Sequence, residues 1–200
     1  GGAALWPENS RIAFEETARL AVEQIEFDVQ LSADGVPVIF HDSTVDRVTD
    51  GTGQVAKKTL AELKALTIFR GGGQILTLAE GMDLLAPTHL VLRCEIKPGP
   101  GMKPYPGLRE ATVRMIADRG LLSRTVLTSF HLPTLSALKA EAVPTLDLIW
   151  LVADPIMRLT GARAVARLAA DAGIGHVAPH HMTLRGEPLE ILRSSGLNVG

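Results

Sequence analysis

Residues 25–29, with the sequence Ile-Glu-Phe-Asp-Val, place two carboxylates two positions apart. The apolar residues around them are typical of a β-strand, in which alternate side chains share a face, so Glu26 and Asp28 project together. Carboxylates this close repel each other and raise each other's pKa unless a cation lies between them. Because a hard divalent ion bound by oxygen ligands is the usual cation, the pair indicates a metal site. The alternative is a polar strand end in contact with solvent.

A second predicted strand, residues 90–96, ends in a similar group of charges. Strand alternation places Arg93, Glu95 and Lys97 on one face, where three charges are unfavourable unless they meet partners. Glu95 could complete an all-oxygen metal site, and Lys97 could neutralise an anionic substrate oxygen. The alternative is an internal salt bridge without function.

His41 and Asp42 follow a third apolar segment, residues 36–40, where that strand ends. A histidine titrates near neutrality and can act as a general acid or base, although a lone histidine is often structural. The connection after Asp28 is short, so the chain can return His41 to the neighbourhood of the two carboxylates. We therefore interpret His41 as a candidate catalytic residue.

Other polar segments are less informative. His176, His180 and His181 are close in sequence, but Pro179 interrupts any helix that would align them, and no cysteine or carboxylate completes a tetrahedral zinc site. We interpret these histidines as structural. Residues 99–107 have the composition of a loop, which could form either a lid over a substrate or a solvated connector.

Segments with helical and strand patterns alternate along the chain. Apolar residues three or four positions apart predict helices around residues 14–21, 108–116 and 165–172. Thr-x-x-Glu capping boxes at Thr59 and Thr77 predict two further helix starts. Strand-length apolar runs occupy residues 25–29, 36–40, 90–96, 125–129, 147–152 and 176–178, and another begins at Leu197.

This alternation predicts an α/β fold with parallel strands covered by helices. One more strand before Gly1 would bring the count to about the eight strands of a TIM (β/α)8 barrel, so we expect a single domain over residues 1–200, clipped at both ends. Between the second and third strands of that barrel, residues 28–36 leave no room for a helix, which predicts either a tight return or an antiparallel hairpin. An open doubly wound sheet is the alternative, although no Gly-x-Gly-x-x-Gly turn follows any strand.

Composition narrows the classes of partner. The chain has 20 Lys and Arg residues against 22 Asp and Glu residues, a formal net charge of −2, so it lacks the basic surplus typical of nucleic-acid or anionic-membrane binding. Charged residues interrupt its most apolar stretches, and we expect no transmembrane segment. The single cysteine, Cys94, excludes an intramolecular disulfide and is compatible with a reducing, cytoplasmic location. The oligomeric state is left open.

Several motifs, taken together and in order, resemble the glycerophosphodiester phosphodiesterases, a family of phospholipase-C-like TIM barrels. They run in family order through most of the chain. The motifs are Pro7-Glu8-Asn9-Ser10 with Ala13-Phe14, residues 25–29, Asp34-Gly35, His41-Asp42, Arg47 with Gly51-Thr52-Gly53, residues 76–80, Glu95-Ile96-Lys97 and Ser129-Phe130.

The resemblance implies metal-dependent hydrolysis of a small-molecule glycerophosphodiester to glycerol 3-phosphate and an alcohol. It implies one divalent cation as cofactor, either Mg²⁺ or Ca²⁺. By motif, Glu26, Asp28 and Glu95 would be the metal ligands, and Lys97 would contact the phosphate. His41 would be one of two acid–base histidines, and Glu8 and Asn9 would support the site.

The family motif with the other catalytic histidine begins His-Arg-Gly, whereas this chain begins at Gly1. We expect that histidine and its arginine to precede the residues given; otherwise the chain would be a fragment or an inactive relative. Two other functions stay open. One is a different metal-dependent TIM-barrel enzyme, such as a lyase that stabilises an enolate with Mg²⁺ and does not need His41. The other is a non-catalytic barrel that binds glycerol 3-phosphate.

Overall fold

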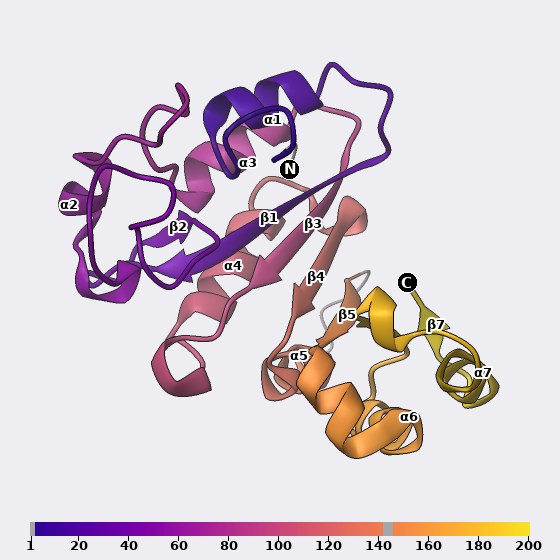
Figure 1. Ribbon diagram of the computed structural model, residues 1–200. Helices are drawn as coiled ribbons and strands as arrows, with labels where there is room; N and C mark the ends of the chain where they lie inside the picture. The colour runs from indigo at the N-terminus through magenta and orange to yellow at the C-terminus, as the bar shows by residue number, and fades with distance from the viewer. Residues whose placement is uncertain (1–2, 142–145) are drawn as a thin grey trace. The chain divides into compact units, whose positions relative to one another are not determined.

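The computed structural model describes residues 3–141 and 146–200. Contacts within the chain divide it into two compact units, residues 1–125 and 126–200 (Figure 1). Each unit alternates strands and helices in the way the sequence predicts. The single domain over residues 1–200 stays a prediction.

The strands of the first unit are ordered β2-β1-β3. β1 (Gln24–Leu31) pairs in parallel with β3 (Val91–Ile96) and antiparallel with β2 (Pro37–Ile39). Of the two connections that the sequence left open, the structure has the antiparallel hairpin, whose turn includes Gly35 at a φ of +79°. The backbone N–H of Phe40 donates to the carbonyl of Asp28 at 3.0 Å, so the hairpin returns the next residue, His41, to β1.

Four α-helices belong to the first unit. Both predicted capping boxes form, with the Thr59 and Thr77 hydroxyls each accepting a backbone N–H of the following helix. The expectation for residues 14–21 is partly wrong, because the first helix ends at Thr17 and Ala21 is exposed on the way to β1. The helices are α1 (Arg11–Thr17), α2 (Leu60–Lys64), α3 (Leu78–Leu85) and α4 (Leu108–Ala117), with 3-10 turns at Val55–Lys57, Pro100–Met102 and Leu122–Arg124.

Buried aromatic and aliphatic side chains fix β1 and β2 against α1 and α3, which lie side by side (Figure 1). Phe14 of α1 and Phe27 of β1 are fully buried, with ring centroids 5.7 Å apart. Gly81 of α3 lets that helix approach β2, because a Cβ there would lie 2.2 Å from the Ile39 Cδ1. Phe27 points away from the neighbouring Glu26 and Asp28, so burying its ring orients both carboxylates toward the opposite face.

The long connection from β2 to α3 has a small core of its own. This core positions the loop after His41, because the loop residues are anchored by buried apolar side chains rather than by a sheet. Its buried members are Val38, Phe40, Val45, Val55, Leu63, Ile68 and Ile75.

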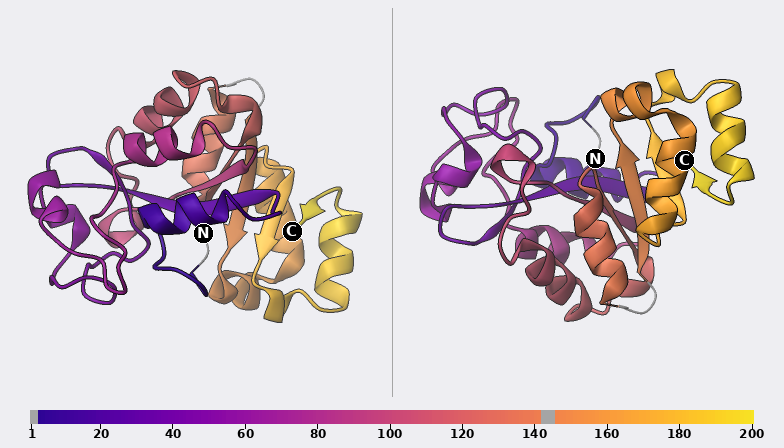
Figure 2. Two further views of the ribbon diagram at one scale, coloured as in Figure 1. Left: turned by 90° about the horizontal axis from the view of Figure 1, so that it is seen from above. Right: turned by 90° about the horizontal axis from the view of Figure 1, so that it is seen from below.

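In the second unit, four parallel strands are ordered β4-β5-β6-β7: β4 (Thr125–Ser129), β5 (Asp147–Val152), β6 (His176–Pro179) and β7 (Asn198–Val199). The helices are α5 (Leu132–Ala140), α6 (Asp154–Asp171) and α7 (Glu187–Ser194), with a 3-10 turn at His181–Thr183. α6 and α7 lie side by side (Figure 2). The sequence analysis did not predict α5 or α7, and it predicted only the second half of α6, which bends at Gly161.

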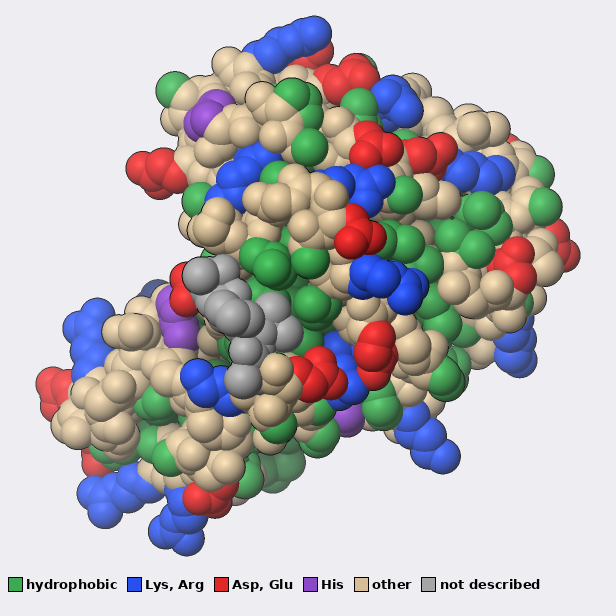
Figure 3. Space-filling view, turned by 180° about the vertical axis from the view of Figure 1, so that it is seen from behind, with side chains coloured by type: hydrophobic (Ala, Val, Ile, Leu, Met, Phe, Trp, Pro, Cys, Tyr) green, Lys and Arg blue, Asp and Glu red, His purple; other side chains and the backbone are tan. Residues whose placement is uncertain are grey.

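The surface carries charges of both signs. Figure 3 shows Lys and Arg side chains interspersed with Asp and Glu over one face. Within the described part of the chain, no helix is both long and apolar enough to cross a membrane. The His180 and His181 rings are in tilted contact, with centroids 4.4 Å apart, and neither belongs to a potential metal-ligand cluster among the described residues.

Candidate functional site

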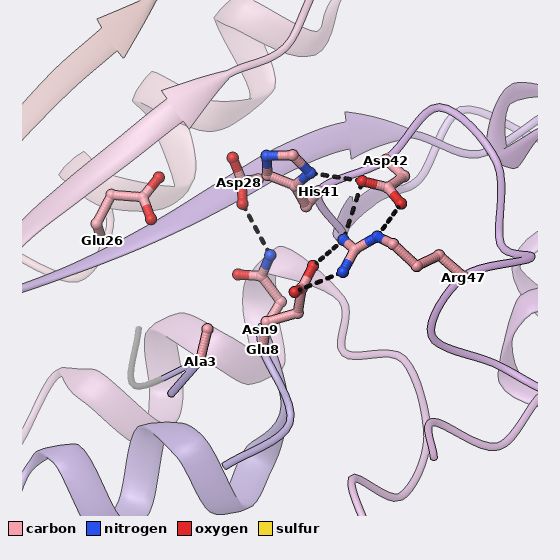
Figure 4. A pocket seen from close by; sticks show the side chains of 8 residues that line it. All are labelled: Ala3, Glu8, Asn9, Glu26, Asp28, His41, Asp42 and Arg47. Atoms are coloured by element: carbon pink, nitrogen blue, oxygen red, sulfur yellow. Dashed lines mark hydrogen bonds and ion pairs between the residues drawn. The ribbon is translucent and has the colours of Figure 1, made fainter. Parts of the chain in front are cut away.

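A pocket of about 530 Å³ opens beside β1 and the turn that follows β2 (Figure 4). All of its lining residues lie in the first unit, and most of them are polar. They are Ala3, Glu8, Asn9, Glu26, Asp28, His41, Asp42 and Arg47.

Three carboxylates meet where β1 and β3 run in parallel. The strand register places Asp28 directly beside Glu95, and both are buried, at 3% and 5% exposure. Glu26 lies two residues before Asp28 on the same face and is open to solvent. Each of the three offers a carboxylate oxygen within 4.8 Å of the others.

Lys97 is the cation that the structure places in this cluster. Its Nζ lies 2.9 Å from the Asp28 Oδ1 and 2.8 Å from the Glu95 Oε1. Burial alone would lower the pKa of Lys97, but its attraction to the two carboxylates outweighs burial and raises that pKa. Lys97 is therefore a fixed positive charge against the floor of the site.

Two carboxyl groups of the cluster have pKa values above their ordinary range. Burial raises the pKa of Glu95 to about 7, although Lys97 acts in the opposite direction. Although part of Glu26 reaches solvent, loss of hydration raises its pKa as well, and the neighbouring Asp28 raises it further. The three carboxylates thus repel one another in a poorly hydrated place.

Asn9 approaches the cluster from the turn that begins α1. Ser10 fixes this turn, because its hydroxyl donates to the Pro7 carbonyl and accepts the N–H of Ala13 as the helix N-cap. The Asn9 Nδ2 donates to the Asp28 Oδ2 at 2.8 Å, and the Asn9 Oδ1 is buried with no hydrogen-bond partner among the described residues. This leaves a neutral oxygen donor beside the carboxylates.

These groups fit a divalent cation. Carboxylate oxygens from Glu26, Asp28 and Glu95 form the hard, anionic donor set that Mg²⁺ and Ca²⁺ take, and the free amide oxygen of Asn9 adds a neutral donor of the same kind. A bound cation would also relieve the repulsion among the three carboxylates.

His41 lies across the pocket and is held by Asp42. The His41 Nδ1 is 2.6 Å from the Asp42 Oδ1, and the ring is about half exposed. Hydrogen bonds from Arg47 lower the pKa of Asp42 to about 2 despite its partial burial, and His41 adds to the effect. Because an ionised carboxylate only accepts hydrogen bonds, the Nδ1 must carry the proton when the ring is neutral, which leaves the Nε2 as the acceptor.

Gln30 fixes the backbone beneath His41. Its buried Nε2 donates to the carbonyls of Phe40 at 2.9 Å and Asp42 at 2.6 Å. Its Oε1 accepts the Tyr105 hydroxyl at 3.3 Å, so the loop of residues 99–107 is tied to β1 at that point. The turn that carries His41 is therefore held by a buried amide.

Glu8, predicted as a supporting residue, lines the pocket beside Arg47. Its carboxylate accepts two hydrogen bonds from Arg47. The sequence alone predicted no role in the site for Asp42, Arg47 or Gln30. The juxtaposition of His41 with Asp42 could have suggested the first, but the contacts of the other two depend on long-range folding.

The chain is similar to proteins of one family. A model of the Glycerophosphoryl diester phosphodiesterase family matches residues 1–199. The glycerophosphodiester phosphodiesterase of Caldanaerobacter subterraneus subsp. tengcongensis is 37% identical over 142 residues, which are 68% of this chain and 58% of that protein. That of Bacillus altitudinis is 32% identical over 158 residues, covering 76% of this chain and 63% of the relative. The matches thus cover less than two thirds of the length of these relatives.

Solved structures agree with this similarity. A crystal structure from Agrobacterium tumefaciens, assigned as a glycerophosphoryl diester phosphodiesterase, matches the whole chain and 80% of its own with a TM-score of 0.92 and 32% identity. An Oleispira antarctica phosphodiesterase in complex with the product sn-glycerol-3-phosphate also matches the whole chain and 80% of its own, with a TM-score of 0.76 and 25% identity. The predicted α/β fold of the TIM-barrel class is thereby confirmed.

Proposed function

Because this chain belongs to the glycerophosphoryl diester phosphodiesterase family, we propose that it acts in the hydrolysis of glycerophosphodiesters to glycerol 3-phosphate and an alcohol. The observation that carries the proposal is the group of carboxylates around Lys97, two of which, Glu26 and Asp28, line the same pocket as His41. Such a site can bind a phosphodiester, whose charge needs cations, and can also move a proton.

Different residues bind the cation and the phosphate. We propose that Glu26, Asp28 and Glu95 hold one divalent cation, Mg²⁺ or Ca²⁺, with Asn9 close enough to add its amide oxygen. When bound, the cation supplies positive charge that stabilises the phosphoryl oxygens. Lys97, already fixed by two ion pairs, contributes a second positive charge at the same place.

His41 moves the proton. With its Nδ1–H directed at Asp42, the Nε2 can take a proton from the water that attacks the phosphorus or, once protonated, give one to the oxygen of the leaving alcohol. A phosphodiester displacement needs both transfers, and His41 can take part in either of them. Asp42 holds the ring in the orientation that this transfer needs.

The test measures glycerol 3-phosphate released from glycerophosphocholine and glycerophosphoethanolamine by the full-length protein. With Mg²⁺ or Ca²⁺ we expect release, and with a chelator we expect a fall of at least about 100-fold that added cation reverses. Comparing the two cations identifies the cofactor, and comparing the two substrates shows the preferred alcohol. Absence of release from folded protein that binds the cation would contradict the proposal for these substrates.

Cation binding should also depend on pH. Without a cation, the pKa of Glu95 is about 7 against an ordinary value of 4.5, so between these values the folded state binds more protons than the unfolded chain. The free energy of unfolding of the cation-free protein therefore falls as pH rises through this window. At pH values below the pKa of Glu95, a cation must displace the proton from that carboxyl group in order to bind. We expect Mg²⁺ or Ca²⁺ to raise the melting temperature more at about pH 8 than at about pH 5.5.

Thermal melts with cation and with chelator, at both pH values, check this expectation. The Glu95→Gln variant serves as the comparison, because it has no titrating carboxylate at that position and should lose the pH dependence of the cation effect. An equal rise in melting temperature at both pH values in the unmodified protein would count against Glu95 as a ligand.

Three other expectations remain proposals. The small-molecule substrate fits a pocket of about 530 Å³, and the mixed surface charge gives no support for a nucleic-acid partner. The lone buried Cys94 is compatible with a reducing compartment, so we keep the cytoplasm as the proposed location. The oligomeric state is open.

A further inference from the structure

Arg47 connects two segments at the edge of the pocket without contacting the carboxylate cluster (Figure 4). Its guanidinium donates to both oxygens of Glu8, a residue 39 positions earlier in the chain. It also donates to both oxygens of Asp42, from the Nε at 2.6 Å and from the Nη2 at 3.0 Å. One planar cation thus holds two carboxylates that would otherwise repel each other.

The contacts explain why the group is an arginine. A guanidinium presents its donors in a fixed planar fork, so it can satisfy two carboxylates at set angles, whereas a lysine offers a single charged atom. The Glu8 side of the fork lies on the turn that begins α1, which Ser10 caps. The Asp42 side lies in the turn that Gln30 holds. Arg47 therefore ties the Asp42 side chain to the turn that begins α1.

Asp42 transmits this restraint to the ring of His41. The same oxygen, Asp42 Oδ1, lies 2.6 Å from the His41 Nδ1 and accepts the Arg47 Nη2. If Arg47 were removed, Asp42 could rotate away from the ring, and Glu8 would repel it. The neutral His41 ring would then lose the partner that selects the Nδ1–H form.

We propose that Arg47 is a positioning residue that, by bridging Glu8 and Asp42, keeps Asp42 against the Nδ1 of His41 and so directs the Nε2 of that ring into the pocket. Arg47 does not touch the reacting atoms. The consequence for catalysis rests on the proposed function, but the effect on the ring does not.

The test compares Arg47→Ala and Arg47→Lys with Arg119→Ala. Arg119 is a matched control, since it lies in the same unit and pairs with the carboxylate of Asp83 outside the pocket. The tautomer of His41 is measured by ¹H–¹⁵N NMR of its ring in the full-length protein at about pH 8.5, where an ordinary histidine is neutral. Steady-state kinetics on glycerophosphocholine give kcat and KM separately.

We expect the unmodified protein and Arg119→Ala to show the Nδ1–H form, and Arg47→Ala to show a mixture of both forms. In Arg47→Ala, kcat should fall by about 10- to 100-fold with little change in KM, because the residue holds other groups and not the substrate. Added guanidinium ion should restore part of kcat. Arg47→Lys should remain impaired, because one ammonium cannot replace the fork.

Two results would overturn the inference. One is an Nδ1–H form that persists unchanged in Arg47→Ala, which would show that Asp42 needs no bridge. The other is a rise in KM with kcat unchanged, which would place Arg47 in contact with the substrate. If the unmodified protein released no glycerol 3-phosphate, the proposed function would fail, whereas the tautomer comparison would still decide whether Arg47 positions the ring.

Discussion

In the Asp28→Asn variant, release of glycerol 3-phosphate is expected to fall by at least about 100-fold, together with the loss of cation binding. Asp28 is the central member of the cluster, since it lies beside Glu95 in the strand register, contacts Lys97 and accepts from Asn9. Asparagine keeps the size of the side chain but removes the charge, so the variant tests electrostatics more than packing.

Two measurements separate this effect from unfolding. The variant loses one of three mutually repelling carboxylates, so we expect its melting temperature without cation to stay close to that of the unmodified protein, while the rise on adding Mg²⁺ or Ca²⁺ disappears. Asp83→Asn makes the same chemical change at an exposed residue of the same unit and should preserve both activity and the cation response. If the melting temperature of Asp28→Asn still rose on adding Mg²⁺ or Ca²⁺, Asp28 would not be a ligand of the cation.

Much of the carboxylate arrangement follows from the strand pattern. The two-residue period of β1 is enough to predict that Glu26 and Asp28 share a face, and Phe27 is buried on the other face as that period requires. The pairing of Asp28 with Glu95 is different, because it depends on which strand lies beside β1 and in which register. Strand alternation offered Glu95 as a possible ligand and the family resemblance added it by motif, but neither gave the register that places it beside Asp28.

The contacts around His41 could not be predicted from the sequence. The bridge from Arg47 to Glu8 spans 39 residues, and its geometry depends on a loop that packs on its own small core rather than on a periodic element. No pattern in the sequence fixes the path of such a loop. Gln30 is similar, since a polar residue inside an apolar strand gives no hint of which carbonyls its amide will meet.

Some misses concern signals that the sequence did contain. Helices α5 and α7 both have proline in the first turn, at Pro133 and Pro188, which favours a helix start. The opposite error occurred at Ala21, where apolar spacing continues although the helix has ended at Thr17. A period of three or four residues indicates which face would be buried, but tertiary packing decides where the helix stops.

His41 should be as important for turnover as Asp28, but for a different reason. In His41→Gln, we expect kcat to fall by about 100- to 10,000-fold, because glutamine can form hydrogen bonds but cannot carry a proton between the reacting oxygens. His89→Gln is the matched control, since His89 lies just before β3 in the same unit and contacts only the carbonyl of Val22 among the bonds described. Its activity should be that of the unmodified protein.

The two variants together distinguish binding from proton transfer. His41→Gln should keep the rise in melting temperature with Mg²⁺ or Ca²⁺ that Asp28→Asn loses, because His41 groups with Glu8 and Asp42 and is not one of the proposed ligands Glu26, Asp28 and Glu95. A lyase that stabilises an enolate would need the cation but not this histidine, and a barrel that only binds glycerol 3-phosphate would show no turnover to lose. Full activity in His41→Gln would therefore move the chemistry away from a histidine-dependent phosphodiesterase, whereas a large fall in kcat with cation binding intact would place His41 at the proton-transfer step.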